Sequence, residues 1–388
     1  MLVAIPAQPA AALTSDASVK DYRPELDVVR FLAFLLVFFH HVYPRIYVQE
    51  HLGEFIAVLG HSGLRVFMSC ANACGMGLCL FFTLSAYLIT DLLLKERSKC
   101  QAISIRKFYI RRMLRIWPLY AVGVTIGLAL AAVGHHASDI TRFEWYLLFA
   151  GNIYCAAHGW SGNPMTLLWS ISVEEQFYLV WPWAMRWLSI RNLAICACCF
   201  IAAANAALFI LGERAAATDF TVWANSFVQL EMFAVGILLA LAKKSIAGLS
   251  AWLGYLMIFA GPVLWFGACF LFRIKPPAEG SESVTSFALM LGFGLGALGC
   301  ASVLHGFCVV GPSCMPRWAS SMGKISYGLY VWHLFMLVVA RGFISSRAGS
   351  VPLALGLTIL TAKLSYSLIE RPFLRLKSRF EVLHSSVV

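Results

Sequence analysis

Long apolar runs separated by short polar segments dominate this sequence. A helix needs about 20 apolar residues to cross the roughly 30 Å hydrocarbon core of a membrane. Runs that approach or exceed this length recur along the whole chain. The pattern predicts an all-α polytopic integral membrane protein with about ten transmembrane helices. They are expected at Leu26–Tyr43, Gly75–Leu94, a segment ending near Val133, Leu168–Trp187, Asn192–Leu211, Trp223–Ala242, Ala251–Leu271, Val284–Val309, Ile325–Val339 and Pro352–Glu370.

The remaining segments define the limits of the predicted membrane domain. Trp145–Cys155 is apolar but about eleven residues long, too short to cross, and is therefore predicted to be interfacial or re-entrant. Pro44–Arg65 mixes Gly, His, Glu and Arg and is predicted to be a loop. Residues 1–22 are expected to be a disordered tail without a signal peptide, 23–380 one membrane-embedded domain, and 381–388 a C-terminal tail.

Basic residues predict the orientation of the chain. With the spans above, one side of the membrane holds 20 of the 30 Lys and Arg residues and the other side holds 8. Short segments rich in Lys and Arg stay in the cytoplasm. Both termini and the basic segment between the second and third spans are therefore predicted to be cytoplasmic.

Composition supports a membrane protein and limits its partners. Hydrophobic residues make up 60% of the chain and charged residues 13%, far from the values of soluble domains. The net charge of +11 is explained by the asymmetry across the membrane and by contact with lipids, so nucleic acid is not an expected partner. Twelve cysteines are present without zinc-type spacing backed by histidine, and no metal is predicted.

The first apolar run carries an unusual load of ionisable side chains, namely Asp27, Arg30, His40 and His41. Arg30 and His41 are eleven positions apart, so in a helix they return to within about 20° of one face, some 16 Å apart along the axis. This spacing favours two groups that line one long cavity. The alternative is that the histidine is simply interfacial, as a histidine near the end of a membrane helix often is.

The fourth predicted span begins with a polar stripe. Ser170, Glu174 and Tyr178 recur every four residues and share one helix face. Because His41 is near the same predicted side of the membrane, Glu174 is a candidate to orient its imidazole as a general base. The alternative is that the carboxylates face water at a helix N-terminus, where negative charge is favoured.

Three arginines, Arg111, Arg112 and Arg115, mark the helix that enters the membrane from the predicted cytoplasmic side. Arginine binds phosphate in a bidentate manner, so the cluster is a candidate site for a phosphate-bearing donor. The alternative is a topology signal that also contacts lipid phosphates.

Taken together, these stretches resemble the membrane-bound acyltransferase 3 family over about residues 22–380. Six pieces match in order and spacing. They are Leu26 to Arg30 with His41, Phe81 to Ser85, Arg111 to Tyr120, Trp169 to Tyr178, Ile325 to His333, and Glu370 to Phe373.

The resemblance implies an enzyme that O-acylates extracytoplasmic molecules. It implies His41 as the catalytic histidine, either as general base or as transient acyl carrier, together with Arg30 and Glu174. Acyl-CoA, most simply acetyl-CoA, would be the donor, with no bound cofactor, and the acceptor a hydroxyl of a polysaccharide, glycolipid or similar molecule. A bacterial cytoplasmic membrane is expected, without the SGNH-type domain of some members, since the chain ends soon after Phe380. Substrate-binding candidates are Arg111, Arg112, Arg115, Ser85, Trp169, Ser170, Tyr178 and His333.

Two other classes of protein remain as alternatives. A transporter or flippase would also have many spans with charges inside the membrane, but it predicts paired inverted halves with broken helices, and the sequence shows no such symmetry. A scaffolding membrane protein predicts no polar stripe on the first span.

Overall fold

The computed structural model describes residues 22–43, 48, 51–134, 143–214, 218–243, 248–274 and 284–382. All the regular elements within these ranges are helices, as the sequence predicts. The predicted N-terminal tail, apart from Tyr22, and nearly all of the C-terminal tail lie outside the described residues.

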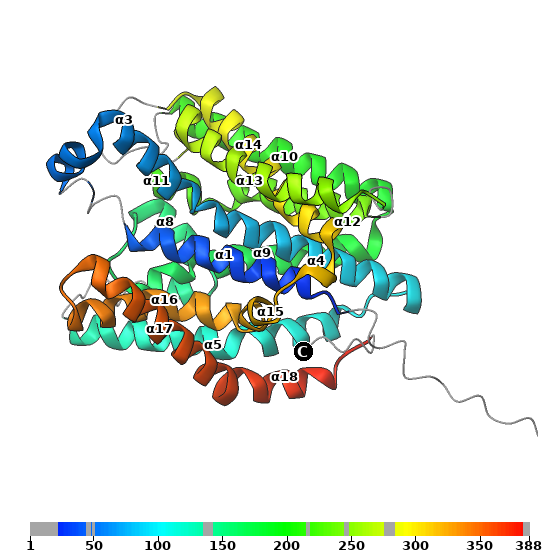
Figure 1. Cartoon of the computed structure of the whole chain (residues 1–388). Coiled ribbons are helices and arrows are strands. Elements are labelled where there is room, and N and C mark those ends of the chain that lie inside the picture. Colours follow the sequence, from blue (N-terminus) through cyan, green and yellow to red (C-terminus); the bar gives the residue numbers. More distant parts are fainter. Residues whose placement is uncertain are drawn as a thin grey trace, which may run out of the picture.

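Each of the ten predicted spans corresponds to a helix (Figure 1). Several begin with a Ser, Thr or Asn whose side chain accepts a hydrogen bond from the first turn; Ser189, Ser250 and Thr285 do so for α10, α13 and α14. The ten helices are α1 (Pro24–Val42), α4 (Met76–Cys100), α5 (Ile105–Val133), α9 (Trp169–Trp187), α10 (Ile190–Glu213), α12 (Ser226–Ala242), α13 (Ala251–Phe272), α14 (Ser286–Val310), α16 (Ser326–Phe343) and α17 (Arg347–Ser365).

Not all of these helices qualify as membrane spans by length and composition. Within the described ranges six helical stretches do, or seven if two helices bent by 74°, Arg317–Lys324 and Ser326–Phe343, count as one. Helices α1 and α9 are apolar but each carries three charged side chains, and α12 has only 17 residues. Three of these charged side chains, Asp27, Arg30 and Glu174, line the cavity described below. The number ten stays a prediction.

The structure also contains helices that the sequence pattern did not indicate. The predicted loop Pro44–Arg65 is wrong from residue 52 onward, because α3 (Leu52–Ala73) occupies it, with a kink at Gly60 where φ is 67°. The short apolar segment near residue 150 divides into two helices, each too short to span a membrane. The further elements are α7 (Phe143–Leu147), α8 (Gly151–His158), η3 (Pro164–Leu168), α11 (Asp219–Trp223), η4 (Pro312–Cys314), α15 (Arg317–Lys324), the π-helical η5 (Tyr366–Glu370) and α18 (Arg371–Ser378).

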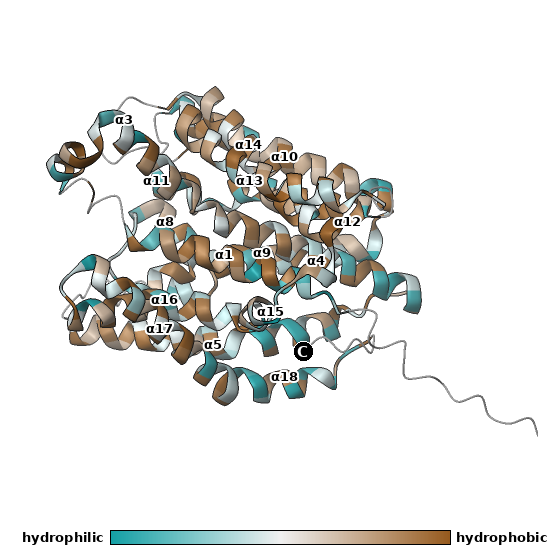
Figure 2. Ribbon diagram, in the orientation of Figure 1, coloured by the Kyte–Doolittle hydropathy of each residue, from teal (hydrophilic) through white to brown (hydrophobic). Residues whose placement is uncertain are grey.

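The helices form two groups with a shared middle. Helices α10, α12, α13 and α14 pack on one side, α5, α16, α17 and α18 on the other, and α1, α4 and α9 run between them (Figure 1). Figure 2 shows that the helices are mainly apolar along their lengths, whereas hydrophilic residues gather toward helix ends and along α18. The polar parts of α1, α4 and α9 are thus enclosed by helices on both sides.

The contact between α4 and α12 depends on a residue without a side chain. A Cβ at Gly236 would lie 2.1 Å from the carbonyl oxygen of Thr83 and 2.9 Å from the Cβ of Ala86. Gly236→Ala therefore has to push the two helices apart. We expect it to destabilise the protein by about 1–3 kcal/mol.

Thermal unfolding of the detergent-solubilised protein measures this effect. Gly356→Ala in α17 is the matched control, because no atom lies within 4 Å of its would-be Cβ and alanine favours the helix. If the two variants unfold at the same temperature, the close packing of α4 on α12 does not limit stability.

Candidate active site

A cavity of about 310 Å³ runs between α1, α4, α5, α9, α16 and α18. It begins at the end of the bundle where α1 starts and α4 ends, with Tyr22, Lys95 and Glu96 among its lining residues. From there it continues along α4 as far as Leu78, about 27 Å deeper at 1.5 Å per residue. A cavity of this length inside a membrane protein can take an extended ligand from one side of the membrane.

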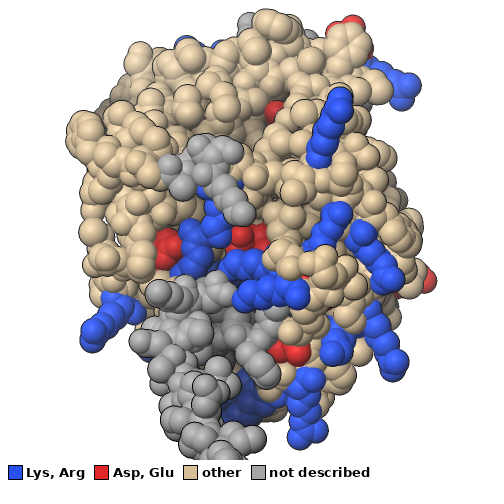
Figure 3. Space-filling view, turned by 90° about the vertical axis from the view of Figure 1, so that its right-hand side faces the viewer, with Lys and Arg blue, Asp and Glu red and all other residues tan. Residues whose placement is uncertain are grey.

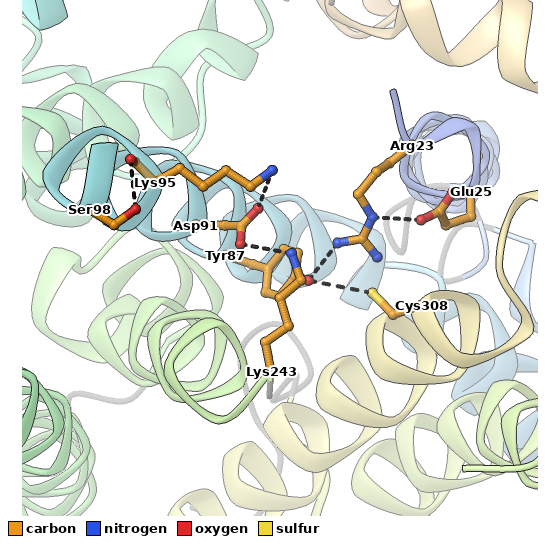
Figure 4. A network of polar contacts seen from close by, with 8 residues as sticks. All are labelled: Arg23, Glu25, Tyr87, Asp91, Lys95, Ser98, Lys243 and Cys308. Atoms are coloured by element: carbon orange, nitrogen blue, oxygen red, sulfur yellow. Dashed lines mark hydrogen bonds and ion pairs between the residues drawn. The ribbon is translucent and has the colours of Figure 1, made fainter. Parts of the chain in front are cut away.

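Most of the acidic side chains near the mouth are already ion-paired (Figure 4). Asp91 binds Lys243 at 2.9 Å and Lys95 at 3.4 Å, and Arg23 binds Glu25 at 2.7 Å while donating to the Tyr87 hydroxyl at 2.7 Å. Deeper in the lining, Arg30 pairs with Asp27 of its own helix. These pairs join α1, α4 and α12 and neutralise one wall of the cavity.

Arg111 is held in a similar way. Its guanidinium pairs with Glu96 at 3.1 Å and donates to the backbone carbonyl of Phe380 at 3.0 Å, and the residue is buried. It therefore joins α4, α5 and the C-terminal segment, and it also lines the cavity.

Four other cations in the lining have no acidic partner within 4 Å among the described residues, namely Arg112, Arg115, Lys324 and Lys377. Of these, Lys324 lies over the Tyr22 ring, 4.9 Å from its centroid. The ammonium of Lys377, on α18, interacts electrostatically with Arg111, Arg112 and Arg115 of α5 and with Glu381. Figure 3 shows this end of the molecule, where Lys and Arg side chains outnumber Asp and Glu. Like charges held together in an enclosed space favour an anionic ligand.

The polar stripe of α9 faces the same cavity. Ser170, Glu174 and Tyr178 all line it, as does Ser85 of α4. The Tyr178 hydroxyl lies 3.2 Å from a carboxylate oxygen of Glu174 and is hydrogen-bonded to Ser85. The stripe predicted from the four-residue spacing thus forms a hydrogen-bonded group, and Glu174 lies beside Tyr178 and not against His41.

The inner end of the cavity is closed by Tyr330 of α16. Its hydroxyl is 2.5 Å from Ser170 Oγ, and its ring packs edge-on against Phe81 with centroids 5.8 Å apart. The same ring also packs against His333, with 5.7 Å between ring centroids. Tyr330 is therefore the side chain that lies between the cavity and His333.

His41 lies on the far side of Tyr330, outside the cavity lining. Gly77 of α4 packs against Ala33 and Leu36 of α1, so the deepest lining residue, Leu78, is about level with Leu36. His41 is five residues farther along α1, about 7.5 Å. The expectation that Arg30 and His41 line one cavity holds for Arg30 only, because His41 is not among the lining residues. Aromatic side chains, including Phe34 and Phe38, pack around its neighbour His333.

The two neighbouring histidines have different contacts. His40 Nδ1 donates to the carbonyl of Ala71 at 3.0 Å and so joins α1 to α3. His41 Nδ1 lies 2.9 Å from the carbonyl of Val37 and 3.3 Å from Nε2 of His333. His41 thus faces the α16 side, toward the end of the cavity, whereas His40 has a packing contact.

The remaining sequence candidates lie apart from the cavity. Trp169 is buried and packs on Trp160, with ring centroids 5.6 Å apart, and neither it nor His333 is in the cavity lining. Conversely, the sequence analysis did not single out Lys377 or Tyr330. A signal for Lys377 exists, since Glu370, Leu374, Lys377 and Glu381 all line the cavity at helical spacing.

Comparison with known proteins agrees with this architecture. The family described as "Acyltransferase domain", acyltransferase 3, matches residues 23–370. The chain belongs to the acyltransferase 3 family. It is 32% identical over 152 residues to the peptidoglycan O-acetyltransferase OatA of Listeria monocytogenes, a match that covers 36% of this chain and 24% of that protein. It is also 24% identical over 402 residues to nodulation protein 10 of Rhizobium leguminosarum bv. viciae, covering 94% of this chain and 97% of that protein. No solved structure matches significantly.

Family membership identifies the chain as an integral membrane acyltransferase. It decides against the transporter and scaffold alternatives. The matched residues include the His41 end of α1 and most of the cavity lining, but not Lys377.

Proposed function

We propose that this acyltransferase transfers an acyl group, most simply acetyl, from cytoplasmic acyl-CoA to a hydroxyl of a cell-envelope or secreted polysaccharide, glycolipid or similar acceptor. The membrane would be the cytoplasmic membrane of a bacterium. The observation that carries the proposal is the long cavity, which begins at a basic end and stops one side chain short of the histidine pair.

The charges suit the phosphates of coenzyme A. Arg112, Arg115 and Lys377 line the outer part of the cavity, and arginine forms bidentate hydrogen bonds with phosphate. The pantetheine arm would extend past Ser85 and Tyr178 toward Ser170. The thioester would then have to pass the side chain of Tyr330 to reach the acceptor. A movement of this side chain therefore belongs to the proposed reaction cycle.

His41 would act as the general base. Its Nε2 takes the proton of the acceptor hydroxyl, the hydroxyl oxygen bonds to the thioester carbonyl carbon, and the carbon–sulfur bond breaks. The thiolate of coenzyme A leaves and receives the proton from the imidazolium. Atoms and charges balance, and the products are an O-acyl ester and free coenzyme A.

Membrane vesicles of defined orientation test this function. Coenzyme A is highly charged and does not cross a lipid bilayer. With acetyl-CoA labelled in its acetyl group, inside-out vesicles should incorporate label into esters that mild alkali releases, and right-side-out vesicles should not.

Cys100 provides the orientation control. It is exposed at the end of α4, in the segment predicted to be cytoplasmic. In a variant whose other cysteines are replaced, a membrane-impermeant maleimide should label Cys100 in inside-out vesicles only. Equal ester formation in both kinds of vesicle would contradict a cytoplasmic donor, and labelling of Cys100 from the outer side would contradict the proposed topology.

A further inference from the structure

His333 is enclosed in the centre of the bundle. It is fully buried on α16, and its ring packs edge-on near Phe34 and Phe38 of α1, with centroids 6.1 and 6.3 Å away. Its Nδ1 lies 2.6 Å from the backbone carbonyl of Tyr330, and its Nε2 lies 3.3 Å from Nδ1 of His41. Both nitrogens of the ring therefore have partners within the protein.

These contacts fix where the protons lie. A carbonyl oxygen only accepts hydrogen bonds, so Nδ1 of His333 carries a proton and donates it to Tyr330. In a neutral ring Nε2 of His333 then has a lone pair, which points at His41. By the same rule the carbonyl of Val37 requires a proton on Nδ1 of His41. That proton is shared between the Val37 carbonyl and His333, and the basic lone pair of His41 lies on Nε2.

The opposite arrangement is disfavoured. A proton on Nε2 of His333 would point at the N–H of His41 across 3.3 Å. Removing the proton from Nδ1 of His41 would leave its lone pair facing the Val37 carbonyl oxygen at 2.9 Å. Only one assignment satisfies all three contacts with both rings neutral.

The geometry points to His333 as a positioning residue that, together with the Val37 carbonyl, holds the tautomer and ring orientation of His41 by accepting a hydrogen bond from its Nδ1. This inference rests on the proposed role of His41 as general base. It changes the sequence-based expectation that His333 binds substrate, since the residue lies outside the cavity lining. It also replaces Glu174 with His333 as the group expected to orient His41, because Glu174 lines the cavity and accepts a hydrogen bond from Tyr178.

A neutral orienting partner differs from the carboxylate of a serine hydrolase triad, which also stabilises the imidazolium by its charge. A histidine orients the base without burying a negative charge in the membrane interior. We therefore expect a smaller effect when it is removed. His333→Leu should lower kcat on the order of 10- to 100-fold, the size found for groups that orient metal-ligating histidines by a hydrogen bond to the second ring nitrogen.

The test compares three variants as purified, detergent-solubilised protein, reconstituted in vesicles with labelled acetyl-CoA and membrane extract as acceptor. His333→Leu should lower kcat and leave the KM for acetyl-CoA unchanged, because the residue is outside the donor cavity. His333→Gln should recover at least part of kcat, since its amide can donate to the Tyr330 carbonyl and offer an oxygen to His41. Trp332→Phe is the control. Trp332 is a buried neighbour whose indole N–H donates a hydrogen bond to Ser365 on α17 at 3.0 Å, and this variant should retain activity.

Thermal unfolding shows whether each variant is folded. Equal losses in His333→Leu and His333→Gln, or a change confined to KM, would overturn the positioning role. Wild-type kcat in His333→Leu would also overturn it. His41→Ala is measured in parallel. If His41→Ala is active, the proposed base itself is wrong; if His41→Ala is inactive while His333→Leu is fully active, only the present inference fails.

Discussion

Replacing His41 with alanine is expected to remove essentially all acceptor acylation, whereas His40→Ala should retain most of it. A positioned general base contributes about 10²- to 10⁴-fold in rate. His41 contacts His333, which in turn packs against Tyr330 of the cavity lining. His40 instead donates to the Ala71 carbonyl of α3, so its loss should affect packing more than chemistry.

The measurement is labelled ester formed by membranes that hold equal amounts of each variant. Thermal unfolding of both proteins should give similar midpoints, with a modest decrease for His40→Ala from the lost contact to α3. An inactive His40→Ala beside an active His41→Ala would reverse the assignment. If neither substitution lowers activity, a mechanism centred on α1 has to be abandoned.

Arg115→Lys is expected to weaken acyl-CoA binding without changing membrane insertion. Lysine keeps the positive charge but loses the planar guanidinium that binds phosphate with two hydrogen bonds. A hydrogen bond to a charged group contributes about 1.5–3 kcal/mol, so the apparent affinity should fall about 10-fold or more. Arg115→Ala should reduce it further, because Arg112 and Lys377 then face the donor alone.

Arg106 provides the matched control. It is exposed in the first turn of the same helix, on the same side of the membrane, and does not line the cavity. Arg106→Ala should leave the KM for acetyl-CoA unchanged. If Arg106→Ala and Arg115→Ala have equal effects on KM and insertion, the arginines act as a topology signal and the donor site lies elsewhere.

The sequence was sufficient to predict the class of protein, the approximate positions of the ten long helices and several residues that line the cavity. Apolar runs of this length have few alternatives to helices in a membrane, because each backbone polar group must be satisfied within the protein. The spacing of Ser170, Glu174 and Tyr178 placed them on one face, and all three do line the cavity. Helix α3 was missed because its first half mixes polar and glycine residues, with a kink at Gly60.

Helical periodicity alone did not determine which polar groups meet. Arg30 and His41 share a face of α1, yet Tyr330, from a helix nearly 300 residues later, separates the cavity from the histidines. Arg111 and Arg115 also share a face, but Glu96 binds one and leaves the other available to a ligand. One partner of His41 is His333, 292 positions away, and only the packing of α16 against α1 brings the two rings to 5.2 Å. Local spacing determines the direction of a side chain from its own helix, whereas its partner depends on which helix the tertiary fold places opposite it.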